Sequence, residues 1–432
     1  MSNRKAQVGY KRRGIARRFV HHRRRGRAPL AALLAVAGPG VLAGLSDDDP
    51  AGVTTYSILG TEFGYQLLWA IPISTALLVL FHLLAVRLAI RSGKGFVAVV
   101  RARYGHTPAK MAGAAFVLAN FGTICAEFAG IGAVAQLAGL PTAPCVLGAA
   151  GLIVALVLAE SFHRVEHVLL ALSTVLSSYL VAGVLAQPHW PQAARGLVVP
   201  SMPLTTGAFI AVTATIGTTL APWGLAFIQS YAVDKGISRR DYGPERIEVV
   251  IGSLLTGIIG IFIAVACAAT LATAGLHIEG ARDAAQALRP LAGEYASLLF
   301  GIGLAGAGLL AAAIVPLATA YSLAEAFGKT GDLDDAARAD RFFYGSFVVL
   351  VGLSATIVSI PHLPLLQLIY FSQLVNAILL APHLVLLVLL NRDVQIVGNH
   401  DILSARWSAA AWLGIALVVS SVLALGVALL AT

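Results

Sequence analysis

The sequence predicts an all-α polytopic membrane protein with about eleven transmembrane helices, arranged as two inverted repeats in which helices 1 and 6 are broken. Two features of the sequence carry this prediction. The chain is 58% hydrophobic and only 12% charged, whereas an average soluble domain is about 25% charged. Two of its apolar segments are also interrupted by a proline followed two residues later by a glycine, at Pro50 and at Pro222.

The apolar residues occur in runs of about 20 residues, the length that crosses ~30 Å of hydrocarbon. Short polar loops separate the runs and leave no room for a soluble domain. We therefore expect spans at 30–62, 66–90, 111–138, 142–161, 167–187, 205–231, 246–276, 295–328, 342–360, 362–390 and 407–431.

Lysine and arginine positions predict how the chain is oriented, because cytoplasmic loops carry an excess of both. With the N-terminus inside, 27 of the 30 basic residues fall in cytoplasmic segments, and only Arg195, Arg282 and Arg289 fall outside. An odd number of spans then places the C-terminus outside, in the cell (inner) membrane. Residues 1–28 form a basic cytoplasmic tail that touches anionic lipid, so the net charge of +9 does not indicate a nucleic-acid partner.

The two interrupted spans are five spans apart, so they enter the membrane from opposite sides. Proline removes a backbone donor and disrupts a helix, and broken helices at matching positions of two repeats mark the substrate site of many transporters. We expect repeat one at about 29–187, repeat two at about 205–391 and an extra helix at about 407–431, all within one transmembrane domain (29–432).

Three consecutive aspartates, Asp47, Asp48 and Asp49, precede Pro50 in the first broken helix. One aspartate at the bilayer centre costs about 2.5–3.5 kcal/mol, so three in a row indicate a site rather than a kink. Carboxylate, carbonyl and water ligands suit magnesium, calcium and manganese. Asp49 is the predicted direct ligand because it adjoins the break. Asp47 and Asp48 are expected to act through water or to line the pathway.

Several segments together resemble the NRAMP family of divalent-metal transporters over nearly the whole chain. They are Gly38-Pro39-Gly40 leading to Asp49-Pro50-Ala51-Gly52, Arg87 to Gly95, Ala126-Glu127-Phe128, Ala320 to Gly328, and Ser372-Gln373. The resemblance implies a LeuT-type inverted repeat and transport of a metal ion. It implies a metal site formed by Asp49, Ala51, Gly52, Thr218, Ala221, Trp223 and Gln373, with Glu127 beside it or on the pathway.

The departures from the family pattern bear on the transported ion. The metal-ion branch has Asp-Pro-Gly-Asn in span 1 and Met-Pro-His in span 6, where this chain has Gly52 in place of the asparagine and Ala221-Pro222-Trp223 in span 6. An aspartate common in span 3 is replaced by Ile124. The loss of a soft thioether ligand favours a harder, more hydrated ion. Together with Asp234 to Ile237, the pattern resembles the NRAMP-related magnesium transporters.

These departures predict uptake of Mg²⁺, with Mn²⁺ accepted, driven by the membrane potential without strict proton coupling. Two alternatives stay open: a proton-coupled Mn²⁺/Fe²⁺ symporter and a LeuT-type carrier of an organic cation. An enzyme is not expected, because the sequence contains no nucleophile–base pair, phosphate loop or His/Cys metal cluster. No resident cofactor is expected, and the transporter is expected to work as a monomer in the bilayer.

Overall fold

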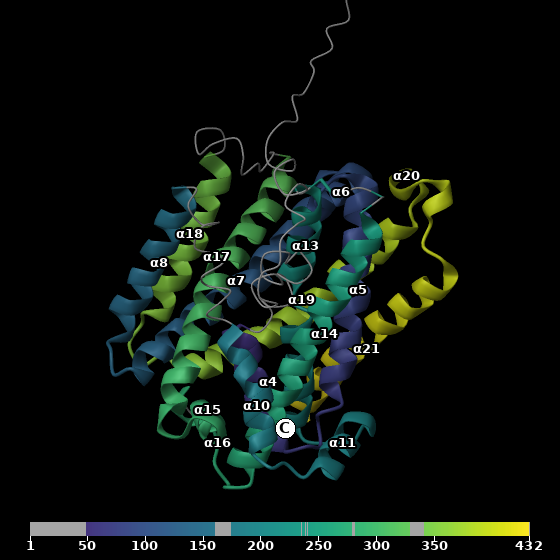
Figure 1. Ribbon diagram of the computed structural model, residues 1–432. Helices are drawn as coiled ribbons and strands as arrows, with labels where there is room; N and C mark the ends of the chain where they lie inside the picture. Colours follow the sequence, from purple (N-terminus) through teal and green to yellow (C-terminus); the bar gives the residue numbers. More distant parts are fainter. Residues whose placement is uncertain are drawn as a thin grey trace, which may run out of the picture.

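The computed structural model describes residues 49–159, 174–234, 236–237, 239, 241–278, 281–328 and 341–431. These residues form helices joined by short connections (Figure 1). The helices are α4 (Pro50–Phe63), α5 (Ala70–Ser92), α6 (Phe96–Tyr104), α7 (His106–Leu137), α8 (Thr142–Leu158), α10 (Ser178–Leu185), α11 (Trp190–Val198), α12 (Thr206–Thr219), α13 (Pro222–Asp234), α14 (Tyr242–Cys267), α15 (Ala281–Gln286), α16 (Arg289–Ala292), α17 (Ala296–Phe327), α18 (Arg341–Val358), α19 (Leu365–Arg392), α20 (Val394–Val397) and α21 (Ala405–Leu430).

The membrane spans lie close to where the hydrophobic runs predict them. In the described part of the chain, eight helices are long and apolar enough to cross a membrane, counting α12 and α13 as one span. Two shorter apolar helices match the predicted spans at 142–161 and 167–187. Helix α4 matches the second half of the first predicted span, whose first half, with Asp47 and Asp48, lies outside the described residues.

The break in the second interrupted span is confirmed. Helix α12 ends at Thr219 and α13 begins at Pro222, with Leu220 outside helical geometry (φ −115°, ψ 59°). In the first interrupted span, α4 begins at Pro50 directly after Asp49, whose backbone is extended (φ −84°, ψ 175°). The helix after the predicted break therefore begins at the expected residue.

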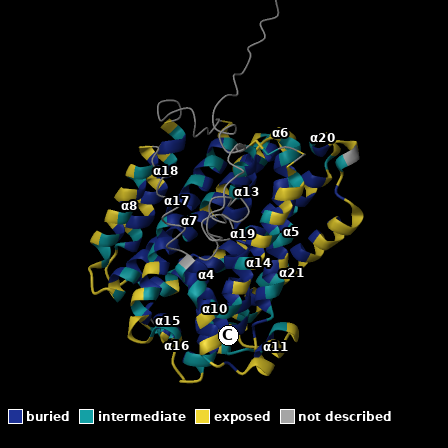
Figure 2. Ribbon diagram, in the orientation of Figure 1, coloured by how far each residue is buried: buried dark blue, intermediate teal, exposed yellow. Residues whose placement is uncertain are grey.

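The centre of the bundle is formed by α4, α7, α12, α17 and α19. Helix α7 packs along both α17 and α19, and α12 packs between α4 and α19. Figure 2 shows exposed residues along the outer faces of α8 and α21, on opposite flanks of the bundle. Many of these are large and apolar, including Leu147, Leu152, Leu413 and Leu423. Such faces suit contact with lipid, whereas the broken helices are in the interior.

The two ends of the bundle differ in charge. Helices α6 and α20 lie at one end, and α11, α15, α16 and the C-terminal end of α21 lie at the other (Figure 1). The three basic residues predicted to lie outside, Arg195, Arg282 and Arg289, belong to α11, α15 and α16. The α6/α20 end carries Arg101 and Arg103 on α6 and is tied together by ion pairs of Arg91 with Asp401 and Arg103 with Asp393. The basic residues predicted to lie inside and those predicted to lie outside are thus at opposite ends of the bundle, and which end faces the cytoplasm stays a prediction.

Candidate metal site at the broken helices

Asp49 caps the start of α4 and is almost fully buried, with 4% of its surface exposed. Its Oδ1 accepts a hydrogen bond from the backbone N–H of Gly52 at 2.7 Å. A carboxylate at this position satisfies one of the free amides of the first turn, and the positive end of the helix dipole stabilises its negative charge. The cap bond is made by Oδ1, and a carboxylate has a second oxygen with which it can bind a cation.

Glu127 brings a second carboxylate to Asp49 from the middle of α7. It has no exposed surface, and its carboxyl group lies close enough to that of Asp49 for the two groups to interact electrostatically. Neither carboxylate oxygen of Glu127 has a hydrogen-bond partner among the described residues. Two buried carboxyl groups that lie close together repel each other when both are ionised, and a buried charge needs compensation. A cation or a proton between them supplies that compensation.

Two glycines allow the start of α4 to approach α7 and α17 this closely. A Cβ atom on Gly130 of α7 would lie 2.4 Å from the Cβ of Pro50, and one on Gly308 of α17 would lie 3.2 Å from the Cγ of Pro50. The proline ring therefore fits against two helix surfaces that lack side chains at the contact. This packing places Asp49, one residue earlier, beside Glu127.

The second broken helix is joined to the first by a buried hydrogen bond. The hydroxyl groups of Tyr56 on α4 and Thr219 on α12 lie 2.8 Å apart. The neighbouring Thr218 hydroxyl is buried and has no partner within the described chain. Pro222 has no N–H to donate to the Thr218 carbonyl four residues earlier. The break therefore leaves the Thr218 carbonyl without its usual helical donor, beside a hydroxyl that has no partner among the described residues.

Ala221 and Trp223 flank Pro222 and are both buried, with exposed fractions of 4% and 1%. The Ala221 carbonyl accepts a hydrogen bond from Gly224 at 3.2 Å, which turns the chain into α13. The Trp223 ring lies with its centroid 6.2 Å from that of Phe227, one turn further along α13. Both residues thus pack tightly at the break, and neither presents a sulfur or imidazole group there.

Gln373 lies on α19 beside the end of α12, where a Cβ atom on Gly217 would be 1.9 Å from the Gln373 carbonyl oxygen. Its side-chain amide is held by neighbours on its own helix. Nε2 donates to Ser372 Oγ at 2.7 Å, and Oε1 accepts from Asn376 Nδ2 at 2.9 Å. Asn376 also donates to Thr123 of α7 at 2.9 Å. Gln373 therefore belongs to a polar network between α19 and α7, and its role as an ion ligand stays a prediction.

The predicted site residues fall into connected groups. Asp49 lies with Ala51 and Gly52 in the buried first turn of α4, against Glu127. The region of Thr218 and Ala221 is joined to α4 through Tyr56. Among the described residues, no group of three or more His, Cys, Asp or Glu side chains is arranged to hold a metal ion.

The sequence reading missed the polar residues that surround these groups. They are Tyr56 and Thr219 at the junction of the broken helices, Thr123 and Asn376 between α7 and α19, and Asn120, which donates to Thr319 at 2.9 Å between α7 and α17. The two asparagines could have been identified from the sequence, because a side-chain amide within an apolar span usually forms hydrogen bonds to another helix.

Comparison with known proteins agrees with the predicted family and fold. Residues 40–430 match the family described as natural resistance-associated macrophage protein-like (Nramp). The structure is similar to that of the Eremococcus coleocola manganese transporter in complex with an aromatic bis-isothiourea substituted compound. The TM-score is 0.70 and the identity 22%, over 93% of this chain and 87% of that one.

More distant transporters share the architecture. MhsT in complex with L-phenylalanine has a TM-score of 0.59 at 15% identity, covering 91% of this chain and 97% of that one. Mhp1, a nucleobase-cation-symport-1 family transporter, has a TM-score of 0.53 at 17% identity, covering 91% of each chain. The expected LeuT-type fold is confirmed. Since the family match spans nearly the whole sequence, the chain belongs to the natural resistance-associated macrophage protein (Nramp) family, whose members are membrane transporters and not enzymes.

Proposed function

We propose that this protein carries divalent metal ions across the membrane, with Mg²⁺ as the preferred substrate and Mn²⁺ accepted. The observation that carries the proposal is the proximity of the buried carboxyl groups of Asp49 and Glu127, which interact electrostatically. A divalent cation neutralises both groups at once, whereas a neutral or anionic solute leaves them in conflict.

The preference for a hard ion follows from the types of atom at the broken helices. Asp49 and Glu127 offer carboxylate oxygens, and Thr218 offers a hydroxyl and a carbonyl without its usual donor. Ala221 provides no soft ligand at the position where a thioether favours softer metals. Magnesium is usually held through one or two carboxylates and keeps several waters. These features support placing the chain in the magnesium-transporting (NRMT) branch of the family.

In this proposal the remaining site residues act mainly through backbone atoms and water. Ala51 and Gly52 shape the first turn of α4 around Asp49, Trp223 forms a buried wall at the break, and Gln373 reaches the ion or its water when α19 approaches. Asp47 and Asp48 precede the cap in the sequence and lie outside the described residues, and they are proposed to act through water or on the pathway.

The membrane potential is sufficient to drive uptake of a divalent ion. Moving one charge through 100 mV yields about 2.3 kcal/mol, so two charges yield about 4.6 kcal/mol. At about 1.4 kcal/mol per tenfold change, this supports roughly thousandfold accumulation. We therefore propose uniport without strict proton coupling.

A second candidate is proton-coupled manganese transport. The proximity of Glu127 to Asp49 favours it, because a proton as well as a metal ion can compensate two neighbouring carboxylates. The fold is also shared with a protein named as a manganese transporter. The soft ligand and the histidine expected for that branch are replaced by Ala221 and Trp223, which favours the magnesium proposal.

The proposed location is the cell (inner) membrane, with the N-terminus cytoplasmic, the C-terminus outside and one chain as the transport unit. The α6/α20 end, which carries Arg101 and Arg103, then faces the cytoplasm. The end with α11, α15, α16 and the C-terminus faces outward, so ions enter from that side.

Competition for radiolabelled manganese uptake into proteoliposomes tests the substrate class. We expect excess Mg²⁺ to suppress the uptake strongly, and cadmium or tetramethylammonium to suppress it weakly, because the site offers oxygen ligands and two negative charges. Protein-free liposomes give the background. Strong inhibition by cadmium with no effect of Mg²⁺ would favour the manganese candidate, and inhibition by tetramethylammonium alone would favour an organic-cation carrier.

A further inference from the structure

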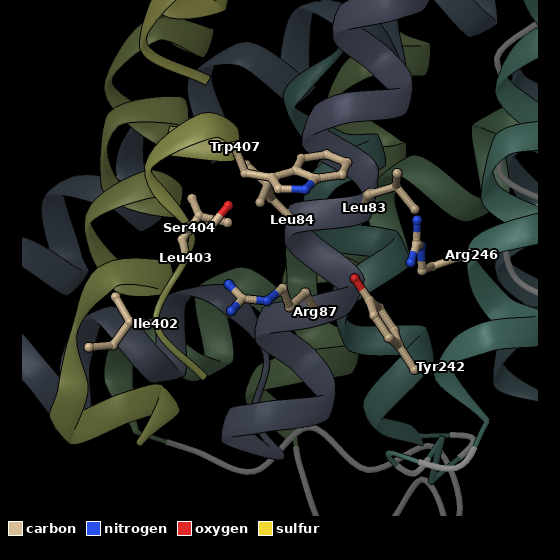
Figure 3. A pocket seen from close by; sticks show the side chains of 9 residues that line it. All are labelled: Leu83, Leu84, Arg87, Tyr242, Arg246, Ile402, Leu403, Ser404 and Trp407. Carbon is tan, nitrogen blue, oxygen red and sulfur yellow. The ribbon is translucent and has the colours of Figure 1, made fainter. Parts of the chain in front are cut away.

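A pocket of about 240 Å³ lies outside the metal site, between α5, α14 and the start of α21 (Figure 3). Its polar lining comes from Arg87 on α5, from Tyr242 and Arg246 on α14, and from Ser404. Its apolar lining includes Leu84 and Trp407. The pocket is thus lined by two arginines, and no acidic side chain of the described residues lines it.

The described carboxylates compensate the positive charge of the two arginines only in part, with Asp401 attracting Arg87. Arg87 donates to the side-chain oxygen of Asn391 at 3.0 Å and to the backbone carbonyl of Asp401, both neutral acceptors. Arg246 is exposed, and its guanidinium lies 5.7 Å from the centre of the Tyr242 ring. The nearby Asp401 carboxylate is shared by Arg91 and Arg239.

The surroundings of the pocket identify the kind of anion that fits. It lies where membrane helices end, and Trp407 at its rim is a residue type enriched at the membrane–water interface. A stripe of exposed apolar residues on α14 begins directly after Arg246 and follows one helix face: Ile247, Ile251, Leu254 and Ile258. Leu413 and Leu417 on α21 are also exposed and apolar. A ligand with an anionic head group and apolar chains would fit a basic pocket that lies next to exposed apolar helix faces.

We propose that this pocket binds the phosphate group of an anionic phospholipid, with its acyl chains along α14 and α21. Arginine binds phosphate through several N–H donors in a planar fork. Arg87 uses only two of its five N–H groups in the contacts above, and Tyr242 and Ser404 supply hydroxyl donors. Basic pockets between membrane helices are suited to anionic lipid headgroups. Bound lipid would join α5, α14 and α21, so it is expected to stabilise the fold.

Thermal unfolding of the detergent-purified full chain with added lipid tests this proposal. We expect phosphatidylglycerol to raise the Tm more than phosphatidylcholine does. Native mass spectrometry would count the lipid molecules that stay bound to the protein. In Arg246→Gln, half-maximal stabilisation should need about fivefold more phosphatidylglycerol, the factor expected for one basic residue at an anionic surface. Arg246 is the better choice because Arg87 also bonds Asn391 and Asp401.

Arg341→Gln is the matched control, since Arg341 is exposed and begins α18 on the other flank of the bundle. Equal responses of the two variants would show that lipid acts through general surface charge and would overturn the proposal. Inorganic phosphate at the same concentration should not raise the Tm. If it reproduced the effect, the pocket would be a site for a free anion and not for lipid.

Discussion

Replacing Asp49 with asparagine is expected to reduce divalent-metal uptake by more than about 100-fold while leaving the fold intact. Substitution of residues that only support metal ligands typically lowers metal affinity or activity by about 10–100-fold, so loss of a direct carboxylate ligand should exceed that range. Asparagine retains an oxygen that accepts the Gly52 hydrogen bond and caps helices as well as aspartate does. The substitution therefore removes the charge and keeps the cap.

Uptake in proteoliposomes and unfolding temperature should be measured together on this variant. Asp49→Ala should also lose the cap, which contributes about 0.5–2 kcal/mol, so its Tm should fall below that of Asp49→Asn. Glu294→Gln is a suitable control because Glu294 is an exposed carboxylate next to Arg289, far from the broken helices. Uptake at the wild-type rate by a well-folded Asp49→Asn protein would show that Asp49 does not bind the ion.

The double substitution Gly52→Asn with Ala221→Met is expected to shift preference from Mg²⁺ towards Mn²⁺ and Cd²⁺ by at least about tenfold, or about 1.4 kcal/mol. It adds an amide oxygen beside Asp49 and a thioether at the break in span 6. A soft sulfur ligand favours softer metals, and two more protein ligands replace waters that Mg²⁺ tends to retain. The measurement is the ratio of initial uptake rates for the three ions.

The size of the new side chain at position 221 needs its own control, because only 4% of the surface of Ala221 is exposed. Gly52→Asn with Ala221→Leu fills a similar volume without sulfur. It should retain the Mg²⁺ preference even if its overall rate falls. An unchanged ion ranking in the methionine variant would place selectivity elsewhere in the pathway.

The positions of the helices could be predicted from the sequence because a membrane span requires a long apolar run. The predicted span 205–231 and its break are observed as α12 and α13, interrupted at Leu220. Proline and glycine determine that break locally, without knowledge of the rest of the fold. The division into repeats at about 29–187 and 205–391 stays a prediction.

The contacts of the site depended on tertiary packing and were harder to predict. Asp49 was expected at the site from its position before Pro50, but its role as the cap of α4 was not foreseen. Glu127 is expected beside the site or on the pathway, and the structure places its carboxyl group close to that of Asp49. That arrangement depends on the close approach of Pro50 to Gly130 and Gly308, which no local pattern indicates.

Magnesium influx into proteoliposomes under an imposed inside-negative potential, with a pH-sensitive dye inside the vesicles, tests the proposed transport most directly. We expect Mg²⁺ to accumulate without acidification of the lumen, and Asp49→Asn vesicles to show neither signal. Absence of Mg²⁺ influx, together with Mn²⁺ influx that acidifies the lumen, would contradict magnesium uniport and establish proton-coupled manganese transport instead.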